Sequence, residues 1–243
     1  MGNIYWFDSR EAGMDAALIT VGEELLCGDI ANTNATWLCG SLNERGVRVQ
    51  RITTIPDEVA EIARVVNEYR AVYDAVVVTG GLGPTHDDVT MEGVAAAVGQ
   101  DLTHNEAAAS WLAEHRDYAA EDLDPGTTQI PAQARMLPNE VGVAPGAVVE
   151  GVYVFPGVPA EMEAMFNRVA EEFSGTQQHS AELDVDEPES QLLDRFADLR
   201  QQFDVTVGSY PGETLRVKIT ADKQDTADEA REWLRRRVET VHS

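Results

Sequence analysis

Residues 75–90 read Ala-Val-Val-Val-Thr-Gly-Gly-Leu-Gly-Pro-Thr-His-Asp-Asp-Val-Thr, and this stretch decides the fold. The apolar, β-branched run from Ala75 to Val78 is typical of a strand that is buried on both faces. Three glycines and a proline follow between positions 80 and 84, which predicts a tight turn. Residues 90–98 then have the composition of a helix. The stretch therefore predicts a strand, a glycine-rich turn and a helix, in that order.

A turn of this kind presents backbone N–H groups at the start of a helix, where the helix dipole also favours an anion. Glycine lets a phosphate approach the main chain because no Cβ stands in the way. The adjacent carboxylates of Asp87 and Asp88 would repel a phosphate, and a divalent cation between them removes that conflict. The alternative is structural: Asp87 is an N-cap and Asp88 interacts only with the helix dipole. The turn matches neither the Walker A pattern nor GxGxxG.

The preceding part of the chain predicts a doubly wound, mostly parallel sheet. Strands are expected at 16–21 and 47–55, with helices at 32–44 and 58–72, the second one capped by Asp57. Strands that alternate with helices form parallel sheets, which bind ligands at the carboxyl ends of their strands. The loops 22–34 and 80–88 are therefore expected to open on the same side of the sheet.

The following part predicts a helix at 105–118, an irregular loop at 119–131, a hairpin of strands 147–150 and 152–155 around Gly151, and a helix at 160–173. Residues 179–241 predict the order strand, helix, strand, strand, helix, which forms a small α+β domain. We expect a disordered extension at 1–13, an α/β domain at 14–173 and the small domain at 179–243. No apolar run reaches the length of a membrane span.

Residues 1–15 have neither an apolar segment nor basic residues ahead of one, so we expect a cytoplasmic protein without a signal peptide. The composition indicates a salty environment. The 243 residues include 43 acidic and 18 basic ones, a net charge of −25. Acidic residues occur in every segment, and such a surface is kept hydrated at high salt, where its self-repulsion is screened. The charge argues against nucleic-acid binding through the phosphate backbone. Cys27 and Cys39 are expected to be reduced, and two cysteines without matching histidines do not predict a zinc site.

Four motifs resemble the amino-terminal domain of the CinA family. They are Gly-Glu-Glu-Leu-Leu-Cys-Gly at 22–28 with Asn-Thr-Asn at 32–34, the stretch 80–90, Asn-Glu-Val-Gly-Val-Ala-Pro-Gly at 139–146, and Pro-Gly-Val-Pro-Ala-Glu-Met at 156–162. The resemblance implies the fold of the molybdopterin-binding MoaB, Mog and gephyrin-type proteins. Residues 179–241, and Val-Gly-Ser-Tyr-Pro at 207–211 in particular, resemble the small second domain of the family and part of eukaryotic FAD synthases.

The resemblance implies a small phosphate-bearing ligand of the ADP-ribose, FAD or molybdopterin class. CinA-type domains are associated with metal-dependent ADP-ribose pyrophosphatase activity, and FAD-synthase relatives with FAD hydrolysis. MoaB and Mog relatives bind molybdopterin instead. The resemblance also implies a homo-oligomer, a dimer or a trimer. Since the sequence ends at Ser243, we expect no carboxy-terminal deamidase domain.

The first hypothesis is therefore a pyrophosphatase that needs a divalent metal (Mg²⁺, Mn²⁺ or Co²⁺) and no organic cofactor. The metal and catalytic residues are expected to be Asp87, Asp88 and Glu24. His86 and Glu23 depart from the family pattern, and His86 is expected to face solvent more than to bind metal. The residues expected to bind the phosphates or the rest of the ligand are Gly80, Gly81, Leu82, Gly83, Thr85, Asn34, Arg135, Asn139, Gly142, Pro156 and Gly157.

Two alternatives remain open at this stage. One is a binding module that holds a pterin or nucleotide without reacting with it, in which Asp87 and Asp88 bond the pterin amino groups or cap the helix. The other is an interaction protein whose pocket has lost its function. The sequence does not choose among ADP-ribose, FAD and molybdopterin, because glycine turns recognise phosphate and not the base.

Overall fold

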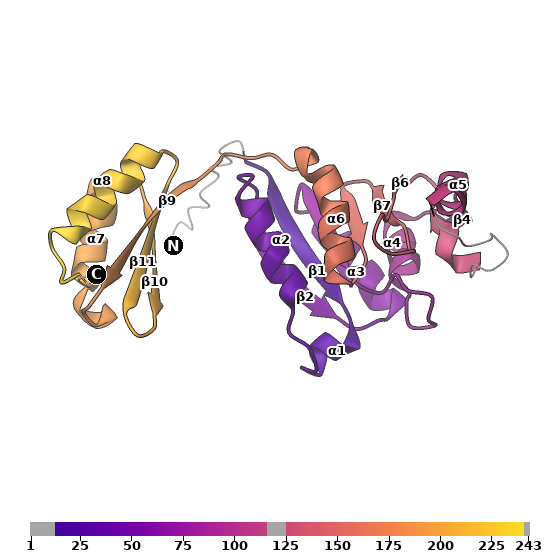
Figure 1. Cartoon of the computed structure of the whole chain (residues 1–243), viewed down its shortest axis with the longest axis horizontal. Coiled ribbons are helices and arrows are strands. Elements are labelled where there is room, and N and C mark those ends of the chain that lie inside the picture. The colour runs from indigo at the N-terminus through magenta and orange to yellow at the C-terminus, as the bar shows by residue number, and fades with distance from the viewer. Residues whose placement is uncertain (1–12, 116–124, 241–243) are drawn as a thin grey trace, which may run out of the picture. The chain divides into compact units, whose positions relative to one another are not determined.

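The computed structural model describes residues 13–115 and 125–240. The chain divides into two compact units, Met1–Gly175 and Thr176–Ser243, which are described separately (Figure 1). The expected extension at 1–13 falls almost wholly outside the described residues, as do the end of the helix expected at 105–118 and part of the loop at 119–131.

The larger unit alternates strands with helices as the sequence predicts. Its elements are β1 (Asp15–Val21), α1 (Glu23–Leu26), α2 (Thr33–Asn43), β2 (Arg48–Ile55), α3 (Val59–Arg70), β3 (Ala75–Thr79), α4 (Thr90–Val98), β4 (Leu102–His104), α5 (Glu106–His115), a 3-10 turn (Pro125–Thr128), β5 (Gln129–Pro131), β6 (Arg135–Leu137), β7 (Gly146–Val149), β8 (Val152–Phe155), α6 (Pro159–Val169) and a second 3-10 turn (Ala170–Glu172).

The main sheet has the strand order β2-β1-β3-β8-β7-β6. The first four strands are parallel, and β7 and β6 continue the sheet antiparallel. In this sheet β1 lies between β2 and β3, so the next strand in the chain, β2, pairs with one edge of β1 and the following strand, β3, pairs with its other edge. The strand order therefore reverses between β1 and β3, and in open α/β sheets such a switch point is where ligands bind. The predicted fold class, a doubly wound and mostly parallel α/β sheet, is confirmed.

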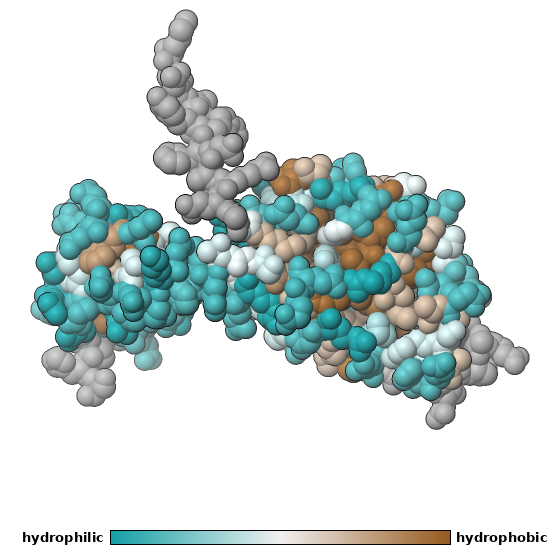
Figure 2. All heavy atoms as spheres, turned by 90° about the horizontal axis from the view of Figure 1, so that it is seen from above, coloured by the Kyte–Doolittle hydropathy of each residue, from teal (hydrophilic) through white to brown (hydrophobic). Residues whose placement is uncertain are grey.

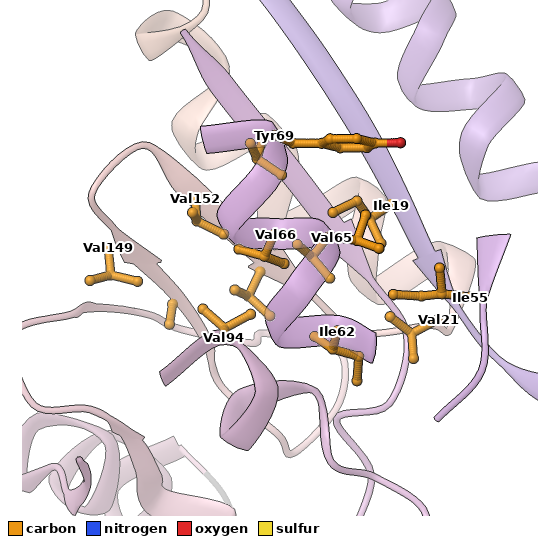
Figure 3. Packing of buried hydrophobic residues seen from close by; sticks show 14 of the residues in the cluster. Ile19, Val21, Ile55, Ile62, Val65, Val66, Tyr69, Val94, Val149 and Val152 are labelled. Atoms are coloured by element: carbon orange, nitrogen blue, oxygen red, sulfur yellow. The ribbon is translucent and has the colours of Figure 1, made fainter. Parts of the chain in front are cut away.

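Helices cover both faces of this sheet. On one face, α3 and α4 bury Ile62, Val65, Val66 and Val94 against Val76 and other strand residues of the same core (Figure 3). On the other face, α2 and α6 pack against alternate residues of the same strands, among them Leu18, Val77 and Phe155. Two-sided burial explains the continuous apolar runs of β1 and β3.

Several local expectations need correction. The loop after β1 contains the short helix α1, and β4 pairs with β5 in a small separate sheet that the sequence did not predict. Helix α3 begins after Glu58, so Asp57 is not its N-cap. Helix α4 begins after Val89 with no side-chain cap. The structural alternative for Asp87, an N-cap of this helix, is therefore wrong.

The smaller unit has the predicted α+β order. It comprises β9 (His179–Val185), a 3-10 turn (Glu189–Gln191), α7 (Leu193–Gln202), β10 (Thr206–Pro211), β11 (Leu215–Ala221) and α8 (Gln224–Arg235). The antiparallel sheet has the order β10-β11-β9. Its core joins alternate residues of β11, such as Val217 and Ile219, to Leu199 of α7 and Leu234 of α8. Hydrophilic residues cover most of the surface of this unit in the view of Figure 2.

Within residues 13–115 and 125–240, none of the helices combines the length and the apolar composition of a membrane span.

Candidate functional site

A pocket of about 920 Å³ opens at the carboxyl ends of β1 and β3, where the strand order reverses. The loops that follow these two strands form much of its wall, as the sequence predicts. The turn after β2 and the segments 142–144 and 156–158 complete it. The lining residues are Val21, Gly22, Glu23, Glu24, Pro56, Asp57, Glu58, Gly80, Gly81, Leu82, Gly83, Pro84, Thr85, Asp87, Asp88, Gly142, Val143, Ala144, Pro156, Gly157, Val158 and Glu161.

Gly80 marks the point where the two loops meet. Its φ is 110°, a conformation that side chains rarely adopt. A Cβ at this position would also overlap the carbonyl oxygen of Val21, at the end of β1. Gly80 therefore brings the main chain of the turn against the neighbouring strand end, and no other residue fits there.

The turn is tied to the helix that follows it. The N–H of Thr90 donates to the carbonyl of Gly81 over 3.2 Å. The Thr90 hydroxyl lies where a Cβ of Gly81 would be, and it is fully buried without a partner among the described residues. Leu82 is 9% exposed and belongs to the core under α3 and α4. These contacts hold the first half of the turn against the body of the domain.

Asp88 shapes the second half of the turn. Its Oδ2 accepts hydrogen bonds from the N–H of Thr85 over 2.9 Å and from the Thr85 hydroxyl over 2.6 Å. The same oxygen lies 2.6 Å from where a Cβ of Gly83 would be. One carboxylate oxygen of Asp88 is therefore used inside the loop, which leaves Oδ1 available toward the pocket.

Asp87 has a different environment. Its side chain is 69% exposed, and its ion-pair partner among the described residues is His86, whose Nε2 lies 2.9 Å from Asp87 Oδ1. The His86 side chain is 91% exposed, so it faces solvent as expected. Asp87 also lines the pocket. Because its carboxylate accepts no hydrogen bond from the turn, it is more available to a ligand or cation than the carboxylate of Asp88.

The charged residues that line the pocket are all acidic. Among its lining residues there is no lysine, arginine or histidine. The nearest basic side chain in sequence, His86, is directed to solvent. An anion that enters this pocket therefore needs a cation with it. The acidic lining residues are Glu23, Glu24, Asp57, Glu58, Asp87, Asp88 and Glu161.

Asp57 is one of the pocket residues that the sequence analysis did not predict, and Glu58 and Glu161 are others. Asp57 Oδ2 accepts from the N–H of Glu23 over 3.0 Å, and Asp57 Oδ1 lies 3.3 Å from where a Cβ of Gly81 would be. Burial raises the pKa of Asp57; the hydrogen bond from Glu23 opposes this, and the nearby carboxylates of Glu24, Asp88 and Asp87 add to the rise. Its place after β2, at the same edge of the sheet, is the signal that would have found it.

Glu24 lies on α1 and lines the pocket, as predicted. Its carboxylate folds back over Gly22, where a Cβ would lie 2.5 Å from Glu24 Oε1. Gly22 thus allows the carboxylate to turn toward the end of β1. Glu24 and Asp57 both line the pocket, and the negative charge of Glu24 adds to the rise in the pKa of Asp57.

Asn34 acts as a support for the pocket wall. Its Nδ2 donates to the carbonyl of Gly157 over 2.8 Å and to the Thr79 hydroxyl over 3.3 Å. The Thr79 hydroxyl in turn donates to the carbonyl of Pro156 over 2.7 Å. These bonds fix the Pro156–Gly157 turn beside Gly80. Asn34 itself lines a smaller pocket of about 80 Å³ next to the main one, and its Oδ1 is buried without a partner in the described structure.

Asn139 is fully buried and organises the loop that contributes Gly142 to the pocket. Its Oδ1 accepts from the N–H groups of Val141 and Gly142 over 3.2 and 2.7 Å. Its Nδ2 donates to the carbonyl of Ala144 and to Glu161 Oε2. Asn139 therefore positions the wall and is not itself among the lining residues.

Arg135 does not reach the pocket. It lies on the edge strand β6, and its Nη2 donates to both carboxylate oxygens of Glu172, over 2.7 and 2.8 Å. Tyr153 donates to the same carboxylate, and burial together with Glu172 raises the pKa of Tyr153 to about 12. The expectation that Arg135 adds positive charge to the ligand site is not met in this structure.

No three His, Cys, Asp or Glu side chains of the described residues gather into a group that would hold a metal ion. The expected set of Glu24, Asp87 and Asp88 lines one pocket but does not form a closed cage. Mg²⁺ commonly keeps several waters and is bound by one or two carboxylates together with substrate phosphates. The residues present therefore fit a cation that is bound jointly by the protein and a phosphate ligand.

The family model described as "probable molybdopterin binding domain" matches residues 17–175, which include the whole pocket. The crystal structure of the protein CinA from Thermoplasma acidophilum has a TM-score of 0.62 and 38% identity, and the match covers 66% of this chain and 98% of that one. This chain belongs to the CinA-type branch of the molybdopterin-binding-domain family.

Two relatives show how far the CinA-type similarity extends. A protein of Archaeoglobus fulgidus is 40% identical over 199 residues, which cover 82% of this chain and 86% of the relative. A CinA-like protein of Geobacter is 39% identical over 159 residues, which cover 63% of this chain and 38% of that protein. The resemblance identified from the sequence motifs is confirmed, and the match to the Geobacter protein is confined to a part of it.

Proposed function

We propose that this protein hydrolyses the diphosphate bond of an ADP-ribose-type or FAD-type dinucleotide with the help of a divalent metal. The observation that carries the proposal is the combination in one pocket of a glycine-rich turn and seven carboxylates without a basic residue. The turn suits a diphosphate, and the carboxylates suit the cation that must accompany it.

The turn offers main-chain N–H groups to the phosphates. Gly81 and Gly83 make room for the Thr90 hydroxyl and the Asp88 carboxylate, which hold the turn in shape. The turn precedes the N-terminus of α4, where the helix dipole favours anions. Asp88 keeps this turn in shape through Thr85. We assign to the turn the binding and orientation of the diphosphate.

The carboxylates of Asp87, Asp88 and Glu24 would hold the metal ion. Once bound, such an ion neutralises phosphate charge and makes a coordinated water more acidic. Asp57 is the side chain suited to take up the proton of the attacking water, because its pKa is raised and its Oδ1 lies beside the turn. The water oxygen bonds to phosphorus, the bridging P–O bond breaks, and two monophosphates leave.

The test is release of AMP from ADP-ribose and FAD by the purified protein in molar KCl with Mg²⁺, Mn²⁺ or Co²⁺. We expect metal-dependent release that falls at least 100-fold in Asp87→Asn and Asp57→Asn. Asp29→Asn is a matched control, because Asp29 is exposed in the loop after α1 and does not line the pocket. Absence of release by the wild-type protein with every metal contradicts hydrolysis.

The second candidate function is binding of molybdopterin without hydrolysis, and the family match favours it. In that case the turn holds the pterin phosphate and the carboxylates accept hydrogen bonds from the pterin amino groups. Saturable pterin binding that survives Asp87→Asn, together with no AMP release, would support it.

We further propose that the protein is cytoplasmic and forms a dimer or trimer. Light scattering in molar KCl measures the assembly, and a monomer at all concentrations would contradict it. The acidic surface is the reason for the choice of salt, since 43 acidic residues repel each other in dilute buffer.

A further inference from the structure

Thr90 is the first residue of α4, and it is completely buried. A threonine hydroxyl on a helix commonly donates to a carbonyl three or four residues earlier, as Thr36 of α2 does to Asn32 over 3.3 Å. No helical turn precedes Thr90, and its hydroxyl makes no hydrogen bond to any described residue. A buried hydroxyl without a partner lowers stability. The fold of α4 therefore gives no reason for a hydroxyl at this position.

The Thr90 hydroxyl and the Asp57 carboxylate lie on the same side of Gly81. Thr90 Oγ1 overlaps the position that a Cβ of Gly81 would occupy, and Asp57 Oδ1 lies 3.3 Å from that position. Since Gly81 has no side chain, nothing of that residue stands between the two groups. Asp57 Oδ2 is already used, because it accepts from the N–H of Glu23. Oδ1 is therefore the Asp57 oxygen that the Thr90 hydroxyl reaches with a small movement of either side chain.

The charges around Asp57 explain why a hydroxyl suits this position. The carboxylates of Glu24, Asp88 and Asp87 act on Asp57 with the same sign of charge, and no lysine, arginine or histidine lines the pocket. A hydroxyl is a neutral donor that can be buried beside Asp57. A carboxylate oxygen accepts more than one hydrogen bond, so Oδ1 can accept from Thr90 and from a water in the pocket at the same time.

We propose that Thr90 is a positioning residue for Asp57: its hydroxyl donates to Asp57 Oδ1 when a ligand is bound and holds the carboxylate toward the attacking water. This inference rests on the proposed function, because it takes Asp57 as the base of that hydrolysis. Thr90 does not line the pocket, so it acts through Asp57 and does not touch the ligand.

The test compares variants by AMP release from ADP-ribose in molar KCl with a divalent metal. Thr90→Val replaces the hydroxyl by a methyl group. We expect its kcat to fall roughly tenfold, the loss of about one hydrogen bond, and its KM to stay within about twofold of the wild type. Thr90→Ser keeps the hydroxyl and should retain kcat within about threefold. Thr103→Val makes the same change at an exposed position outside the pocket and should react like the wild type.

Thermal melting separates a positioning role from a structural one. Because the Thr90 hydroxyl has no partner in the fold, Thr90→Val should melt no lower than the wild type. Thr128→Val is the matched control: Thr128 is also buried, but its hydroxyl lies 2.9 Å from His104 Nδ1. That variant loses a hydrogen bond and should melt lower. An equal decrease in Thr90→Val would show that the fold itself uses the hydroxyl, and would overturn the inference.

The kinetic outcomes separate this inference from the proposed function. Wild-type kcat in Thr90→Val overturns the inference while the hydrolysis stands. A kcat in Thr90→Ser as low as in Thr90→Val also overturns it, because the methyl group and not the hydroxyl would then matter. If the wild-type protein releases no AMP with any divalent metal, the proposed hydrolysis itself fails, and the inference fails with it.

Discussion

Asp88 accepts two hydrogen bonds from Thr85 with the same oxygen, one from the backbone N–H over 2.9 Å and one from the hydroxyl over 2.6 Å. These two hydrogen bonds close the second half of the glycine-rich turn that lines the pocket. Adjacent Asp87 makes no such contact and is largely exposed. Asp87 and Asp88 are adjacent residues of the same type, yet the Asp88 side chain stabilises the turn and the Asp87 side chain does not.

The first prediction separates the roles of these two side chains. Asp88→Ala removes both hydrogen bonds of the turn and should lower the free energy of unfolding by about 1–2 kcal/mol. Asp87→Ala should leave the free energy of unfolding within about 0.5 kcal/mol of the wild type and still abolish metal-dependent ligand binding. Denaturant titrations and calorimetry measure the two effects. Equal destabilisation by both variants would contradict the division of roles.

The second prediction concerns Gly80. Gly80→Ala should destabilise the larger unit by more than about 2 kcal/mol, because it adds backbone strain at φ 110° and an overlap with the Val21 carbonyl. Gly28→Ala is the matched control: its φ is 78°, but a Cβ there meets nothing within 4 Å. It should cost only about 1 kcal/mol. A loss at Gly80 no larger than at Gly28 would mean that the two loops are not in contact.

The third prediction is a pH dependence that depends on Asp57. Burial raises its pKa in the folded protein above the ordinary value of 3.8, so the folded state holds this proton more tightly than the unfolded state. Stability is therefore lost as the pH rises from about that value through the folded pKa. Asp57→Asn removes this loss and should melt at a higher temperature than the wild type at pH 7, without metal.

The difference should shrink as the pH is lowered through the folded pKa and below the ordinary value of 3.8, where the wild-type carboxyl is protonated in both states. Melting curves at several pH values in constant KCl measure it. A variant that is less stable than the wild type at pH 7 would show that the hydrogen bond from Glu23 outweighs the burial and repulsion of the charge.

The fourth prediction tests the position of Arg135. Arg135→Ala breaks an exposed ion pair with Glu172 and should cost less than about 1 kcal/mol of stability. Ligand affinity should be unchanged, since Arg135 is not among the residues that line the pocket. Calorimetric titration of ADP-ribose gives the answer, and a tenfold weaker affinity would return Arg135 to the ligand site.

Local sequence patterns predicted most of the architecture. Helix α4 covers Thr90–Val98 and β9 covers His179–Val185, both at the expected residues, because apolar periodicity and turn residues act over short distances. The same patterns placed the loops after β1 and β3 at one pocket, since parallel strands end at the same edge of the sheet.

The errors concern residues whose partners lie far away in sequence. Asp57 had the local signature of an N-cap, but its carboxylate bonds the N–H of Glu23, 34 residues earlier. Arg135 was expected at the ligand, but its guanidinium pairs with Glu172, 37 residues later. No local pattern in the sequence reveals that pairing. For a residue such as Asp57, a position just after a strand that ends near the switch point predicts a place in the pocket better than its preference for helix caps does.

The most direct test of the central claim is whether ligand binding requires a divalent metal. ADP-ribose should be titrated into the wild-type protein in molar KCl, once with excess EDTA and once with Mg²⁺ or Mn²⁺. If the carboxylate-lined pocket binds the diphosphate through a shared cation, metal should tighten binding at least tenfold. Equally tight binding in EDTA would contradict the account, because the phosphates would then lie among seven carboxylates without a compensating charge.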